Sequence, residues 1–355
     1  MPIQGLTRLR RHQFGRQNAL GNAVPATRAY PLQGVPDVNL SWTDPDGDFG
    51  SIYPIAPPTR GAPDITAALT IPVVNYDDLP LVHSGFFGGG ETPTGGGDAK
   101  TWNYTPSSLT PDDFDHFTYQ FGDDVVTDWF QLRDGIITDF EVSGADQNAL
   151  TGSMTWRFAH AASTGSTDSP VEGSVPTSLS VDANAIHVYL KDCSLFIDSA
   201  AGSIGSTQIL DAMHSFTMRA TQEIDNKRFA NGSQEFEING YGRGATSIEL
   251  SIVFAKTDDT VGTGSESDAW MSDDAVNRYV RLSFESTAFA QTAGSPDVPY
   301  SWVIDMPMRY YTRTDGEIGG NTTVELLGRA FYDSTLTNPF ESTIVNTLTE
   351  AEFSS

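Results

Sequence analysis

Hydrophobic and polar residues alternate with a period of two along much of this chain. The alternation is clearest in five segments, at 136–143, 150–158, 216–221, 248–254 and 280–285. Because successive side chains of a strand point to opposite faces, each segment predicts a strand with one buried face and one polar face. The pattern is typical of antiparallel sheets and not of the continuously apolar strands of α/β folds. We therefore expect a mostly β protein.

Helix signals are few. The segment at 77–87 offers Asp77 or Asp78 as an N-cap, apolar residues at helical spacing and Gly88 as a stop. A second short helix is predicted near 268–277, where an acidic cap precedes apolar residues.

The order of predicted elements is alike on the two sides of a stretch of small and polar residues at 161–182, which is interpreted as a linker. Each side runs strand, helix and then three strands, and Arg157 would match Arg329. An internal duplication explains this order, and the alternation that all β-rich chains share is the alternative. We expect two tandem antiparallel β-sandwich or partial-barrel domains, each with one short flanking helix. The expected divisions are an N-terminal basic arm at 1–20, a first β domain at 21–160, the linker at 161–182, a second β domain at 183–348 with a long hairpin at about 207–240, and a C-terminal tail at 349–355.

The net charge of the chain and its distribution limit the classes of function to be considered. The 355 residues include 46 Asp and Glu against 20 Lys and Arg, for a net charge of −26. A general nucleic-acid binder is disfavoured, because non-specific affinity comes from cations that neutralise phosphates. Yet the residues before Asp37 hold five arginines and no acid. Such an arm suggests docking on an acidic surface of a neighbouring copy, and a frayed terminus is the alternative.

Sequence motifs for catalysis or metal binding are not evident. The single cysteine, Cys193, allows no disulfide within the chain and no cysteine-based metal cluster. The six histidines lack metalloprotease spacing, and the DPDGDFG segment at 44–50 is interpreted as a tight turn. No G-x-S-x-G elbow is present. We expect no enzyme activity and no cofactor, although paired carboxylates for glycoside hydrolysis stay open as an alternative.

Several segments resemble one protein family. The passage FGDDVVTDWFQLRDGIITDFEVSGADQNALTGSMTWRFA resembles tail tube (major tail) proteins of long-tailed bacteriophages. The opening QNALGNAVPATRAYPLQG and the close MRYYTRTDGEIGGNTTVELLGRAFYDSTLTNPFESTIVNTL are similar to the ends of that family. The resemblance spans about residues 19–348 and lies in the style of the strands rather than in a rigid motif.

The resemblance implies a structural virion protein. Copies of such proteins join side by side into rings around a continuous β-barrel, and the rings stack into the hollow tube through which DNA passes during ejection. It implies trimeric rings if the duplication is real and hexameric rings otherwise. It also implies tape measure, tail terminator and baseplate proteins as partners, DNA transit without specific binding, no membrane, assembly in the host cytoplasm and a place in the virion tail.

Candidate residues follow from that expectation. A bore that lets DNA slide should be acidic or neutral, so polar-face acids of the predicted strands are the lumen-lining candidates: Asp139, Glu141, Glu249 and Asp305. Arginines of the arm and cations of the hairpin are the inter-ring contact candidates: Arg8, Arg10, Arg11, Arg16, Lys227 and Arg228. Two other readings stay open, namely a β-rich carbohydrate-binding or glycoside-hydrolysing protein, and another virion component such as a tail terminator, baseplate hub or capsid decoration protein.

Overall fold

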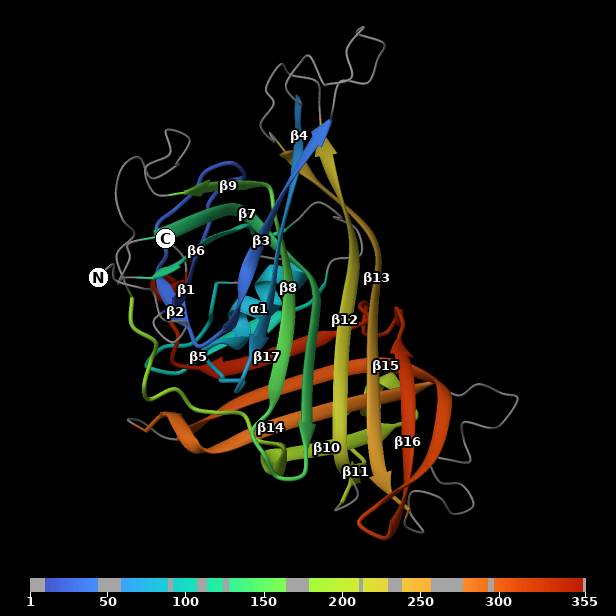
Figure 1. Cartoon of the computed structure of the whole chain (residues 1–355). Helices are drawn as coiled ribbons and strands as arrows, with labels where there is room; N and C mark the ends of the chain where they lie inside the picture. Colours follow the sequence, from blue (N-terminus) through green and yellow to red (C-terminus); the bar gives the residue numbers. More distant parts are fainter. Residues whose placement is uncertain are drawn as a thin grey trace, which may run out of the picture.

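The protein is mostly β in a computed structural model, as the alternation predicts (Figure 1). The structure describes residues 10–43, 59–88, 92–106, 114–123, 128–163, 179–210, 213–228, 238–256, 277–292 and 297–353. The turn at 44–50 and all but the last residue of the second helix predicted near 268–277 lie outside these residues.

Eight strands form a continuous antiparallel layer, called here the front sheet, whose long strands run roughly upright in Figure 1. Each strand pairs with the next along the layer. In spatial order they are β3 (Gln33–Thr43), β4 (Thr59–Ile71), β8 (Thr151–Phe158), β7 (Asp128–Ala145), β12 (Met213–Arg228), β13 (Ile238–Ala255), β16 (Asn321–Ala330) and β15 (Val298–Ile318).

Two groups of strands form a second layer behind the front sheet, and the long strands β7 and β15 belong to both layers. The N-terminal part of β7 pairs with strands of one group, and the N-terminal part of β15 pairs with strands of the other. The first group comprises β2 (Arg28–Tyr30), β1 (Arg10–Arg16), β6 (Phe117–Asp123) and β9 (His160–Ser163). The second comprises β11 (Gln208–Ile209), β10 (Cys193–Asp198), β14 (Arg278–Gln291), β17 (Glu341–Asn346) and β5 (Lys100–Tyr104).

Aromatic side chains fill the space between the layers. Phe14 of β1 lies 5.0 Å from Trp156 of β8, and Phe216 of β12 lies 5.7 Å from Phe284 of β14, measured between ring centroids. Three of these rings come from buried faces that the alternation predicts, whereas Phe14 lies in the segment that was expected to form the arm. The predicted alternation is wrong in one place, because Thr138 is skipped in a bulge of β7.

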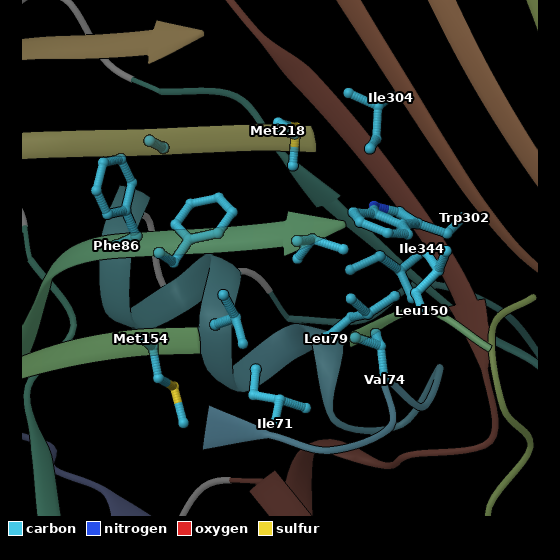
Figure 2. Packing of buried hydrophobic residues seen from close by; sticks show 14 of the residues in the cluster. Ile71, Val74, Leu79, Phe86, Leu150, Met154, Met218, Trp302, Ile304 and Ile344 are labelled. Carbon is cyan, nitrogen blue, oxygen red and sulfur yellow. The ribbon is translucent and has the colours of Figure 1, made fainter. Parts of the chain in front are cut away.

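The helix α1 (Leu79–Phe87) is buried on every side between the layers (Figure 2). Asp78 is its N-cap and Gly88 its C-cap, as the sequence predicts. Its residues carry no charge, which suits a helix without a solvent face. In Figure 2 its Leu79 and Phe86 lie among side chains from both halves of the chain, including Met218 and Trp302. The helix therefore belongs to a common core and does not flank one domain.

Hydrogen-bonded strands connect the two halves of the chain directly. β12 pairs with the C-terminal part of β7 over seven positions, and β17 pairs with β5. The halves thus share one large sheet and one buried core. The division into two tandem domains stays a prediction.

The strand-pairing pattern of the first half recurs in the second half. The pairings β1·β6, β3·β4, β4·β8, β6·β7, β7·β8 and β7·β9 correspond to β10·β14, β12·β13, β13·β16, β14·β15, β15·β16 and β15·β17. The bulges recur as well, since β7 skips Thr138 and β15 skips Tyr311. The order of elements noted in the sequence therefore has a counterpart in three dimensions.

Three predicted boundaries besides that of the N-terminal arm differ from the structure. Residues 161–163 of the expected linker continue strand β9, because they pair with β7. The expected tail contains the short helix α3 (Glu350–Phe353), whose Phe353 ring is buried 5.1 Å from Trp102. The strands of the long hairpin extend to Ala255. Two single-turn 3-10 helices, Leu190–Asp192 and Ala201–Ser203, complete the described elements.

Candidate functional site: a polar sheet face with two open edges

The outer face of the front sheet carries a row of charged residues on adjacent strands. Glu141, Arg219, Glu249, Arg329 and Arg309 lie directly opposite one another in the order β7, β12, β13, β16 and β15. Directly opposite positions on neighbouring strands share a face and interact. The row therefore runs unbroken across the junction of the two halves.

On this face, arginines neutralise two of the expected lumen-lining acids. Arg219 donates hydrogen bonds from Nε at 3.1 Å and Nη2 at 2.7 Å to one carboxylate oxygen of Asp139. Arg329 donates one at 2.7 Å to Glu249. These hydrogen bonds raise the pKa of both guanidinium groups, so both stay charged. The face is consequently far less acidic than its carboxylates alone suggest.

Asp305 is not on this face. It lies on the part of β15 that belongs to the second layer, between the buried residues Ile304 and Met306, and therefore points outward from that layer. Arg281 binds it with two hydrogen bonds of 2.7 Å. The sequence placed Asp305 with the other three acids because alternation identifies a polar face without showing which layer carries it. Asp139, Glu141 and Glu249 do share a face.

The inter-ring candidates are spread over several environments. Residues 10–16 form β1, which lies between β2 and β6 in the folded body, so the free arm expected up to residue 20 is wrong for this part. Arg16 forms an ion pair of 2.9 Å with Asp115, and Arg11 donates a hydrogen bond to the carbonyl of Leu179. Arg10 is exposed. Arg8 lies outside the described residues, as do the side chains of the last two candidates, Lys227 and Arg228, at the end of β12.

The front sheet ends in two edges that sequence reasoning missed. Among the described strands, β3 pairs only with β4, and the C-terminal part of β15 pairs only with β16. Large apolar side chains are exposed on both edges, with exposed fractions of 51% for Val35 on β3 and 42% for Ile318 on β15. Unpaired strand edges are templates for pairing with another chain. Two such edges on one sheet are a surface suited to self-association.

The buried histidines belong to the core. Burial lowers the pKa of His12 and of His83 to about 4, so both are neutral near pH 7. His83 lies within α1 with its Nδ1 2.9 Å from the Leu79 carbonyl oxygen. Across the described ranges, no three His, Cys, Asp or Glu side chains come together in a way that could hold a metal ion.

Comparisons add no family assignment. No protein-family model matches the chain, and no curated protein matches it. None of the helices in the described ranges is long and apolar enough to cross a membrane.

Proposed function

We propose that this protein is a structural tail tube protein that polymerises into stacked rings around a hollow bore. One observation carries the proposal: the front sheet has a polar outer face, a packed inner face and two open edges. A sheet of this form can continue from one copy to the next until it closes, and closure removes every unpaired edge. The junction of β7 with β12 shows that this kind of edge can join two similar halves.

The charge pattern of the outer face supports its role as the wall of the bore. Paired arginines and carboxylates, such as Arg219 with Asp139, leave few free cations to hold phosphates. Non-specific DNA affinity grows with the number of phosphates that cations neutralise. DNA would therefore pass along this wall without specific binding. The remaining candidate, Glu141, lies directly opposite Arg219 and adds negative charge to the same wall.

Ring size is inferred from the recurring pairing pattern together with the six-repeat ring that the resemblance implies. Each chain supplies eight strands to the front sheet, four from each half. Three chains would supply 24 strands and six repeats, so the proposal is a ring of three chains. The proposed partners are further copies of the chain and the tape measure, terminator and baseplate proteins of a virion tail.

Negative-stain electron microscopy and sedimentation of the full-length protein test this function together. We expect stacked rings or tubes with a stain-filled centre. The length of the tubes should grow with protein concentration. Compact particles of one chain at every concentration would refute it. Binding of such particles to an oligosaccharide array would instead favour a carbohydrate-binding protein.

A further inference from the structure

The edge strand β3 has a counterpart inside the sheet. A register shift lies between Leu40 and Trp42 in β3 and between Gln222 and Ile224 in β12, 182 residues later. At each shift, two residues of β3 or β12 span the same length as three residues of the partner strand, which is β4 or β13. The counterpart of β3 is therefore β12, and Asp37 corresponds to Arg219.

The other edge also has a counterpart. In β7 the residue skipped against β8 is Thr138, and in β15 the residue skipped against β16 is Tyr311, 173 residues later. The C-terminal part of β15 thus corresponds to the C-terminal part of β7, and Thr314 corresponds to Glu141.

These two counterparts, β12 and β7, are hydrogen-bonded to each other within the chain. Within the described structure, β3 and the end of β15 have no such partner on their outer sides. We propose that β3 of one copy pairs antiparallel with residues 312–318 of β15 in a second copy, with Asp37 opposite Thr314. The proposal deepens the tube function and rests on it, because it names the contact that would join copies within a ring.

The register follows from the internal junction. Arg219 lies opposite Glu141 there, and Thr217 lies opposite Ser143. Carried to the counterpart positions, the first pair places Asp37 opposite Thr314 and the second places Val35 opposite Gly316. A slip by one residue would turn the apolar face of β3 to the wrong side of the sheet, so the register is well defined.

The side chains of the two edges are compatible in this register. The exposed apolar residues Val35 and Ile318 become diagonal neighbours on one face, where each covers part of the other. No like charges lie opposite each other, because Asp37 faces Thr314 and Val38 faces Arg313. Pro36 has no N–H group, so the new ladder loses at most one hydrogen bond at that position.

The two edges cannot meet within one molecule. They lie at opposite ends of an eight-strand layer, roughly 34 Å apart at the usual spacing of about 4.8 Å between strands. The contact is therefore head-to-tail between copies, the kind that closes into a ring or continues as a filament.

Disulfide trapping tests this register. The Asp37→Cys/Thr314→Cys variant is prepared in a Cys193→Ser background, and Gln33→Cys/Thr314→Cys is the matched control, four residues out of register on the same face. Under mild oxidation we expect reducible cross-links between chains in the first variant, at least 10-fold faster than in the control. Monomers only, or equal rates in both variants, would overturn the register.

Electron microscopy of the oxidised samples separates this inference from the tube function. Selective cross-links in rings that do not stack would support the register and contradict the tube. Hollow tubes without selective cross-links would support the tube and contradict the register.

Discussion

Arg219 on β12 binds Asp139 on β7, 80 residues earlier in the chain, and so forms a polar link across the junction of the two halves. The pair lies on the outer face, with exposed fractions of 54% and 26% for the two side chains. Opposite-charge pairs at such exposure add little stability, because water screens them. The backbone ladder beneath therefore holds the junction, and the ion pair mainly sets the charge of the face.

The ion pair between Arg219 and Asp139 should therefore contribute little to stability. Arg219→Gln should lower the free energy of unfolding by no more than about 1 kcal/mol, and the effect should shrink in high salt. Denaturant unfolding at low and high salt measures it, with Asp139→Asn and the double variant completing the cycle. A coupling energy of several kcal/mol that persists in high salt would contradict this account.

Asn346 should matter far more than its size suggests. Its Oδ1 accepts hydrogen bonds from Trp102 Nε1 at 3.0 Å and from the Leu348 amide at 3.1 Å, and its Nδ2 donates to the Tyr76 carbonyl. Asn346→Ala would leave these buried groups unsatisfied, at a cost of about 2–4 kcal/mol.

Asn103 supplies the control for that measurement. It lies on the neighbouring strand β5, is exposed and accepts a hydrogen bond from Thr343. Asn103→Ala should change the free energy of unfolding by less than about 0.5 kcal/mol. Urea unfolding measures the free energy of unfolding of both variants. Equal losses of stability would contradict a stabilising role for the buried Asn346 amide.

Asp77 should make stability depend on pH. Burial raises its pKa to about 6, and the positive charge of Arg28 opposes this shift only in part. A raised pKa means that the folded state binds the proton more tightly than the unfolded state. The contribution of Asp77 is therefore full below about pH 4 and is lost as the pH rises through 6.

Replacing the Asp77 carboxylate with an uncharged amide should remove the loss of stability at high pH. Asp77→Asn should raise the free energy of unfolding at pH 7.5 by about 1–3 kcal/mol and change it little at pH 4. Asp98→Asn makes the same replacement at an exposed aspartate and is the control for the substitution itself. A stabilisation by Asp77→Asn that is equal at both pH values would rule out the proposed titration.

Gly34 is required for the shape of the edge strand β3. Its φ is +142°, and a β-carbon there would lie 2.4 Å from the Ala68 carbonyl oxygen. Gly34→Ala should cost at least about 2 kcal/mol and displace β3 from β4. Thermal unfolding and hydrogen exchange of the β3 amides measure both effects. Gly202→Ala is the control and should be neutral, because a β-carbon added there would have no neighbouring atom within 4 Å. Equal behaviour of the two variants would argue against strain at Gly34.

The core could be read from the sequence because burial follows the alternation directly. Phe216, Met218 and Ala220 are buried as their period of two predicts, and Thr217 and Thr221 are not fully buried. The site could be read only in part. Asp139 and Glu249 share the expected face, but their arginine partners lie 80 residues away in sequence, and alternation carries no information on such distant pairs.

The open edges could not be inferred from residue types. Val35 and Ile318 look like any strand residues, and only the pairing of whole strands shows that they lie at the ends of the sheet. That β7 and β15 each belong to both layers was not predicted, for a related reason. Each strand continues without a break through both layers, so its residues signal one long strand and not two partners.

A cryo-electron microscopy reconstruction of the assembled full-length protein would show which face of the front sheet lines a bore and which strands join neighbouring copies. We predict a hollow ring in which the front sheet lines the bore, with Arg219 and Glu249 on the inner wall and β3 of each copy beside β15 of the next. A bore lined instead by the outer side of β14 and β17, or a particle with no central channel, would contradict the account.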